Sequence, residues 1–478
     1  MASFLESRTR LTSNTWKNRL RIIKVLIILA SLAVAGGISW ILPPTFKYFD
    51  LLLGAAFGLF AFFMLYRMGR FEYGIIAIVL SAILLNFFTL PTGTDSRIVI
   101  SLLVTLGLIS IWLLQLIITK DREQTRPLPI TVPIILFVVV NIISYFWGNL
   151  LRDPLVEVWS TFPFVQLGAL AVNILLPLLA LMVANKIRDV KWLKIITGLV
   201  VGIGALVVVS YLFQLPTLAA SANGARGLFA TWVGALAFAL ILFHKDLSIR
   251  VKIFLLILIA AWSYYHFVMH TFWLSGWIPL FAAMGLLSFF HSKKLFLVAI
   301  VLGLVLFAVR FEWFYQNIYV ANMEEGGAER LDLWRTNINL VIRHPVFGTG
   351  PAGYAVYYMT YNPYDARSTH NNIFDILAQT GFIGFAVFSW MAAAFIMLGN
   401  RMRIALRGKR NFEEAYTNAV LAGFLAALLS MMLGDWVLPF AYNQTITGFD
   451  NAAFTWIFIG GMAALYYLKK SEGVEELR

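Results

Sequence analysis

Long apolar runs, separated by short polar segments, repeat along almost the whole chain. Each run covers about 17 to 25 residues, the length that an α-helix needs to cross a bilayer. The runs lie at 23–42, 49–66, 72–90, 97–118, 129–148, 165–185, 193–213, 227–243, 253–269, 272–290, 295–312, 372–398, 415–438 and 451–468. The pattern predicts an all-α fold, a polytopic bundle of about 12 to 14 transmembrane helices. The runs at 253–269 and 272–290 are also compatible with one hairpin that does not fully cross.

Composition agrees with this pattern, because 60% of the residues are hydrophobic and 13% are charged, against about 25% charged in soluble domains. We therefore expect a single membrane domain over residues 1–478 with no soluble domain. The net charge of +13 is accounted for by basic loops that face anionic lipid, so no nucleic-acid partner is expected. With no cysteine, the chain has no disulfide and no thiolate metal site.

Positive charges are unevenly divided between the two sides of the predicted bundle. If the N-terminus is inside, only nine of the 37 Lys and Arg residues fall in outer segments. These nine are Lys47, Arg97, Arg152, Arg226, Arg310, Arg330, Arg335, Arg343 and Arg367. Because cytoplasmic loops are enriched in Lys and Arg, we expect both termini to be cytoplasmic, in a bacterial-type cytoplasmic membrane.

One outer segment, residues 313–371, is far longer than the other loops. Long loops inside compact proteins are usually functional, so the active site is expected here, on the outer face. Within this loop, Leu331, Trp334, Ile338 and Val341 share one helical face, which predicts an amphipathic helix ending at His344-Pro345. The helix either lies along the membrane interface or packs over the bundle.

The stretch "RHPVFGTGPAGY" contains Gly348, Gly350 and Gly353 in the spacing of a dinucleotide-binding turn. That fingerprint requires a preceding strand and a following helix. Here a predicted amphipathic helix precedes the turn and Pro351 interrupts it, so no nucleotide cofactor is expected. We interpret the glycines as a tight turn that folds the loop back and brings Arg330 toward His370.

Arginine dominates the outer basic residues, and its planar guanidinium suits bidentate binding of phosphate. Arg226 lies between Gly224 and Gly227, and Arg330 occupies the first turn of the predicted amphipathic helix, where a cation opposes the helix dipole. Arg335, five residues later, does not share its face. For Arg226 the alternative is an arginine that anchors a helix end at the interface. For Arg330 the alternative is simple pairing with Glu324, Glu325 or Glu329.

His370 is the best-placed general base among the six histidines, because it stands where the long loop re-enters the membrane. Imidazole titrates near neutrality and can accept a proton from a hydroxyl; the alternative is a polar helix cap formed with Asn371. Asp375 and Asp435 are acidic residues at membrane depth and hence functional candidates, unless they pair with outer arginines. No Asp-x-Asp, phosphate-loop or zinc-spacing motif occurs, so neither a metal nor a cofactor is expected.

Three stretches together are similar to the signature region of the O-antigen ligase and polymerase superfamily. They are R-x-x-x-W from Arg330 to Trp334, "HPVFGTGPAGY" from His344, and "HNNIFDILAQTGFIGF" from His370. "RGLF" at Arg226 resembles the family's earlier arginine-containing loop. The resemblance implies a C-type glycosyltransferase-like fold that uses an undecaprenyl-diphosphate-linked glycan as donor, without a metal. It implies that His370 activates the acceptor hydroxyl and that Arg226 and Arg330 hold the diphosphate.

The secondary candidates for the site are Arg335, Arg367, Asn371, Asp375 and Asp435.

We therefore predict a metal-independent, inverting, O-antigen ligase-like membrane glycosyltransferase. Its partners would be the lipid-linked donor, membrane lipids and an acceptor that is a glycan, a lipid or a protein. Open alternatives are a repeat-unit polymerase, a protein O-oligosaccharyltransferase and a lipid-linked-glycan flippase. A transporter should place polar groups near the midplane, whereas these candidates lie at the outer rim. The tyrosines of "YAVYYMTYNPY" suit an interfacial aromatic belt better than a sugar-stacking surface.

Overall fold

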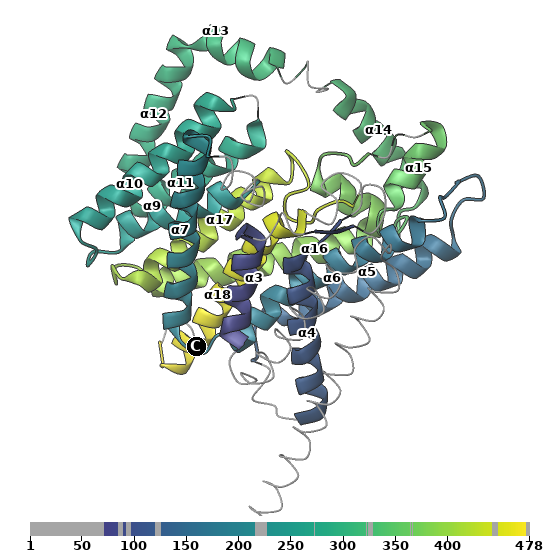
Figure 1. Ribbon diagram of the computed structural model, residues 1–478, viewed down its shortest axis with the longest axis horizontal. Coiled ribbons are helices and arrows are strands. Elements are labelled where there is room, and N and C mark those ends of the chain that lie inside the picture. The colour runs from purple at the N-terminus through teal and green to yellow at the C-terminus, as the bar shows by residue number, and fades with distance from the viewer. Residues whose placement is uncertain are drawn as a thin grey trace, which may run out of the picture. The chain divides into compact units, whose positions relative to one another are not determined.

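The structure is a computed structural model, and most of the residues it describes are helical (Figure 1). It describes residues 71–84, 89–91, 97–119, 126–215, 227–271, 273–321, 323, 328–363, 365, 367–441 and 448–474. The predicted spans 23–42 and 49–66 lie outside these residues, and so does Arg226.

The helices are α3 (Phe71–Leu84), α4 (Ile100–Thr119), α5 (Thr131–Leu150), α6 (Phe162–Lys186), α7 (Val190–Leu212), α9 (Phe229–Phe243), α10 (Ile249–Ser263), η4 (Tyr264–Met269), α11 (Leu274–His291), α12 (Lys293–Val309), α13 (Phe311–Phe314), η5 (Tyr315–Val320), α14 (Ala328–Arg343), α15 (Gly353–Tyr361), α16 (Asn372–Ala405), α17 (Phe412–Ser430) and α18 (Gly448–Ser471). A short antiparallel pair, β1 (Thr89–Pro91) and β2 (Arg97–Val99), joins α3 to α4, with Leu90 opposite Ile98.

The chain divides into two compact units. One comprises residues 1–74 and 107–124, and the other comprises residues 75–106 and 125–478. In the described part of the first unit, Gly74 packs so closely on Leu108 that a Cβ would lie 2.5 Å from its Cδ2 atom. All the helices from α5 onward belong to the second unit, as do all the candidate site residues.

Each of the other predicted spans overlaps a helix, which confirms an all-α polytopic membrane fold. The span predicted at 97–118 begins with strand β2 before α4, and the span predicted at 253–269 covers both α10 and η4. Among the described residues, eight helices are long and apolar enough to cross a membrane, or nine if a bent pair counts as one span. That pair is α12 with the segment Phe311–Val320, bent by 86°. No side chain of α12 is buried in the protein, as expected for a helix surrounded by lipid.

The core of the second unit is held by close helix contact at small residues. A Cβ at Gly460 of α18 would lie 2.8 Å from the Cβ of Val183 on α6, and one at Gly423 of α17 would lie 2.5 Å from Trp232 on α9. Trp232 also donates from Nε1 to Thr455 Oγ1 at 3.0 Å. Since lipid is as apolar as the core, such packing and interhelical hydrogen bonding supply the cohesion between helices in a membrane.

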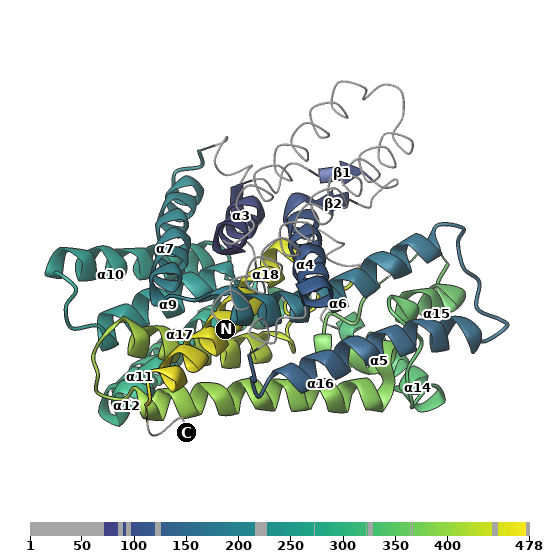
Figure 2. The same cartoon turned by 90° about the horizontal axis from the view of Figure 1, so that it is seen from below.

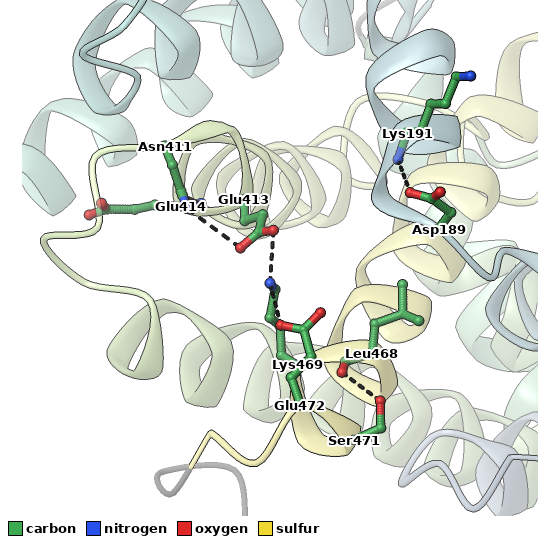
Figure 3. A network of polar contacts seen from close by, with 9 residues as sticks. All are labelled: Asp189, Lys191, Asn411, Glu413, Glu414, Leu468, Lys469, Ser471 and Glu472. Carbon is green, nitrogen blue, oxygen red and sulfur yellow. Dashed lines mark hydrogen bonds and ion pairs between the residues drawn. The ribbon is translucent and has the colours of Figure 1, made fainter.

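Three segments that the charge pattern predicts to be inner lie together: the start of α7, the start of α17 and the end of α18 (Figure 3). Lys469 of α18 pairs with Glu413 of α17 at 2.8 Å and with Glu472 at 2.8 Å. Asp189 caps α7 by accepting from the backbone N–H of Lys191 at 2.7 Å. Which side of the membrane this end faces stays a prediction.

Candidate functional site

The candidate base, His370, stands in the connection that leads into α16. Its backbone has φ of +51°, a left-handed conformation that costs a non-glycine residue about 1–2 kcal/mol. Its own N–H donates to Ser368 Oγ at 3.1 Å. A strained backbone of this kind persists where the surrounding structure fixes it, and such positions cluster at functional sites.

The predicted amphipathic helix is present as α14, and it ends at Arg343, directly before His344-Pro345. Its buried side differs from the prediction: Leu333, Asn337, Leu340 and Val341 are buried. By contrast, Leu331 and Ile338 are 56% and 46% exposed. The predicted face was therefore wrong in part, because α14 packs on the protein with one side and leaves an apolar stripe, with Ile342, on the other.

Arg330 and Arg367 are brought close to His370 by the fold. The pKa of His370 is lowered from its usual value, first by burial and then by the positive charges of Arg330 and Arg367. A lowered pKa keeps the imidazole neutral, the form that can accept a proton. The structure therefore places the His370 imidazole beside two guanidinium groups that disfavour its charged form.

The two guanidinium groups differ in how they are paired. Arg367 lies between two carboxylates, with Nε 2.7 Å from Asp365 Oδ1 and NH1 bonded to Glu329, and these contacts raise its pKa. Arg330 has no such carboxylate partner among the residues that the structure describes. Arg367 thus fastens the first turn of α14 to the His370 connection, while none of the described carboxylates neutralises Arg330.

Arg335 lies away from this cluster. It is 80% exposed and pairs only loosely with Asp332, at 3.6 Å. An exposed pair of this kind contributes about 0–1 kcal/mol. Of the secondary arginine candidates, the structure brings Arg367 to His370 and leaves Arg335 on the exposed side of α14.

Asp375 is buried in the first turn of α16 and binds the residue before His370. Its Oδ1 accepts from the backbone N–H of Thr369 at 3.1 Å and from Thr369 Oγ1 at 2.7 Å. On the other side of the connection, Trp334 Nε1 donates to the Thr369 carbonyl at 2.9 Å, and its ring packs on Phe374. In the described residues no arginine pairs with Asp375.

The two asparagines after His370 have different tasks. Asn371 caps α16, because its Oδ1 accepts from the N–H of Ile373 at 3.0 Å. Asn372 binds the segment after α17: its Oδ1 accepts from the N–H groups of Val437 and Leu438 at 3.0 and 3.1 Å, and its Nδ2 donates to the Leu438 carbonyl at 2.7 Å. Asn372 therefore joins that segment to the His370 connection.

Asp435 belongs to the same segment and is not helical, because α17 ends at Ser430 instead of near 438. It is fully buried, and its Oδ2 accepts from the N–H of Phe440 at 2.7 Å. Its charge acts on Asp375, so the fold brings these two candidates together. The next residue, Trp436, packs on Gly227, whose Cβ would lie 2.6 Å from the indole Cζ3.

The glycine turn of residues 348–350 packs backbone to backbone against α16. The N–H groups of Thr349 and Gly350 donate to the carbonyls of Ala378 and Gln379 at 2.8 and 3.0 Å. At this level α16 is broken, since Gly381 has φ of +63° and non-helical ψ. Figure 2 shows α5 alongside α16; from α5, Ser144 Oγ donates to the Phe347 carbonyl at 2.8 Å.

The tyrosines of α15 are mainly core residues. Tyr354 is fully buried and donates to the Leu333 carbonyl at 3.1 Å, while Tyr357 OH accepts from the N–H of Asp153 at 3.1 Å. Tyr361 alone of the α15 tyrosines is mostly exposed, at 70%. The predicted aromatic belt is therefore wrong for Tyr354 and Tyr357, which hold α15 against α14 and the segment after α5.

The arrangement gathers an imidazole, His370, and two guanidinium groups, Arg330 and Arg367, beside the start of α16. In the part of the chain that is described, no group of three His, Asp or Glu side chains is placed to hold a metal ion. The fold and site thus define a multi-pass membrane protein with a cationic site at one end of its helices.

Comparison with known families narrows this class. The O-antigen ligase family model matches residues 266–389, which include α14, the glycine turn, His370 and the break in α16. The match confirms the resemblance to the O-antigen ligase and polymerase superfamily, and it indicates a membrane enzyme that transfers glycan. No curated protein sequence matches the chain.

Several contributors to the site were not predicted from the sequence. Asn372 lies within the quoted signature and Thr369 directly precedes it, and the polar run "STHNN" could have drawn attention to both. Ser144 and Gly148 of α5 carry no such signal, because they are two small residues inside an apolar run. At Gly148 the helix lies so close to the glycine turn that a Cβ would be 2.7 Å from the Gly350 nitrogen. Their role depends on α5 lying against a turn about 200 residues later in the chain.

Proposed function

We propose that the protein transfers glycan from an undecaprenyl-diphosphate-linked donor to an acceptor hydroxyl at the outer face of the membrane. The observation that carries this proposal is the position of Arg330, without a carboxylate partner in the described residues, beside the His370 imidazole, whose pKa burial and the two arginines lower. Both lie inside the region that matches the O-antigen ligase family. An anionic leaving group needs a cation such as Arg330, and a hydroxyl nucleophile needs a base such as His370.

In the proposed reaction, the acceptor oxygen attacks the anomeric carbon of the donor sugar. The bond from that carbon to the diphosphate oxygen breaks, and the hydroxyl proton passes to His370. A single displacement of this kind inverts the anomeric configuration. The products are the new glycoside and the polyprenyl diphosphate.

The leaving diphosphate gains negative charge in the transition state, and Arg330 is placed to stabilise that charge. A preorganised donor in a water-poor site is worth far more than the same donor in water, and removing one costs about 10² to 10³ in rate. Arg226, outside the described residues, is the second proposed ligand of the diphosphate. Arg367 is neutralised by Asp365 and Glu329, so its proposed role is to hold α14 against the His370 connection.

A ligase differs in its acceptor from two other enzymes that would use the same mechanism. A repeat-unit polymerase uses a second lipid-linked glycan as acceptor, and a protein O-oligosaccharyltransferase uses a Ser or Thr side chain. We favour a ligase-like acceptor, following the matched family model. The outer-face location and cytoplasmic termini follow from the charge distribution along the sequence.

Purified protein in vesicles that contain a lipid-linked repeat unit tests the proposal. Glycan joined to an added lipid or glycan acceptor, with EDTA present, is the expected result. Longer lipid-linked chains without added acceptor would show a polymerase instead. Movement of the intact donor across the bilayer without any new glycosidic bond would refute the enzyme proposal and favour a flippase.

A further inference from the structure

Hydrogen bonds from two helices hold the backbone next to His370. Its φ of +51° is a conformation that L-residues adopt only when something enforces it. The residue before it, Thr369, is fully buried. Every polar group of Thr369 is bonded, and the partners come from two different helices, α14 and α16.

From α16, one carboxylate oxygen of Asp375 serves as a double acceptor. Asp375 Oδ1 receives the Thr369 N–H at 3.1 Å and the Thr369 hydroxyl at 2.7 Å. The same hydroxyl oxygen accepts from the N–H of Asn371 at 3.3 Å. The hydroxyl proton has a second acceptor in the Asn371 carbonyl at 2.8 Å. Asp375 therefore holds Thr369 directly, and Thr369 in turn bonds to Asn371 on the other side of His370.

From α14, Trp334 completes the clamp. Its indole Nε1 donates to the Thr369 carbonyl at 2.9 Å, and its ring lies 5.4 Å from that of Phe374. Arg330 is four residues earlier on the same helix, hence on the same face. The contact that fixes the His370 connection thus also fixes the distance from that connection to Arg330.

We propose that Thr369, Asp375 and Trp334 are positioning residues that hold the His370 imidazole against its substrate. Asp375 does so by accepting two hydrogen bonds from Thr369 at Oδ1, and it transfers no proton. This inference rests on the proposed function, because it assigns these residues a role through His370. None of the three needs to touch the substrate. A shift of about 1 Å in a reacting group can cost about 10²-fold in rate.

Isosteric pairs of variants test the clamp. Thr369→Val keeps the shape and removes the hydroxyl, while Thr369→Ser keeps the hydroxyl. Asp375→Leu removes the acceptor, while Asp375→Asn keeps an Oδ1 that can accept both bonds. In the reconstituted transfer assay we expect kcat to fall by about ten- to hundredfold for the Val and Leu variants, with KM for the donor unchanged, and to stay close to the parental value for Ser and Asn.

The same changes made together with His370→Ala distinguish positioning from general damage. If Thr369 acts through His370, adding Thr369→Val to His370→Ala produces no further loss, because the effects of residues that act through one another are not additive. Trp334→Phe, which keeps the ring and removes the Nε1 donor, should lower kcat in the same way. Asp375→Leu buries a leucine where a carboxylate was bonded, so Thr369→Val and Trp334→Phe carry the test if that variant does not fold.

Two results would overturn the inference while leaving the proposed function intact. One is full kcat in Thr369→Val. The other is a loss in Asp375→Asn as large as in Asp375→Leu, which would assign the carboxylate a charge or proton role. Full transfer activity in His370→Ala, by contrast, would overturn the proposed function itself.

Discussion

Gly348 allows the glycine turn to lie against the broken part of α16, and replacing it with alanine should be costly. Its φ is +67°, and a Cβ there would lie 2.6 Å from the carbonyl carbon of Gln379 and closer still to the Ala378 oxygen. Left-handed alanine costs about 1 kcal/mol. To relieve the overlap, the turn must move away and lose the Thr349 and Gly350 hydrogen bonds to α16, at about 1 kcal/mol each or more when the groups stay buried.

The total expected for Gly348→Ala is about 3–5 kcal/mol. Gly408 provides the matched control, because its φ is +81° but nothing lies within 4 Å of the position that a Cβ would take. Gly408→Ala should therefore lose only the conformational part, about 1 kcal/mol. Thermal unfolding in detergent, followed by tryptophan fluorescence, should rank parent, Gly408→Ala and Gly348→Ala in falling order of midpoint. Equal midpoints for the two variants would refute the claim that the turn packs directly on α16.

Three further predictions concern the site. The pKa of His370 is lowered by burial and neighbouring cations, so transfer should fail only below the pH at which an ordinary histidine titrates. Arg367→Gln removes one of these cations and favours the imidazolium, so the acid limb of the kcat/KM profile should move to higher pH. An acid limb that does not move would contradict this. Asn372→Ala breaks three hydrogen bonds and should lower the unfolding free energy by about 3 kcal/mol. Asn371→Ala, which removes only the helix cap, should lower it by about 1 kcal/mol. Equal unfolding midpoints for the two variants would argue that Asn372 does not join the segment after α17 to the His370 connection. Arg335→Gln should change stability by less than about 0.5 kcal/mol and leave the transfer rate at the parental level, so a large rate loss would show that this exposed residue meets the substrate.

Helix positions followed directly from the sequence, because crossing a bilayer requires a long continuous apolar run. The end of α17 was the clearest error. Val437 and Leu438 are apolar and extended the predicted span to 438, but the helix ends at Ser430. These residues are buried in a non-helical segment whose backbone is satisfied in part by Asn372, a contact that no periodicity can show.

The candidate site was predictable in its residue types and less so in its geometry. The signature placed His370, Arg330 and Asp375 in one loop region, and the fold puts His370 beside Arg330. Arg367 is paired with two carboxylates and Arg330 with none among the described residues, and this difference depends on tertiary contacts. The left-handed backbone of His370 depends on them too. The buried side of α14 was misjudged because apolar residues lie both on its buried side, at Leu333 and Leu340, and on its exposed side, at Leu331, Ile338 and Ile342.

The most direct test of the account is the rate at which polyprenyl diphosphate is released from a lipid-linked glycan donor when acceptor is added to the vesicle-reconstituted protein. His370→Ala and Arg330→Ala should each lower this rate by at least about 10²-fold. Arg335→Ala, a change of the same size on the exposed side of the same helix, should release the product at the parental rate. Parental release by the His370→Ala and Arg330→Ala proteins, shown by their unfolding midpoints to be folded, would contradict the account.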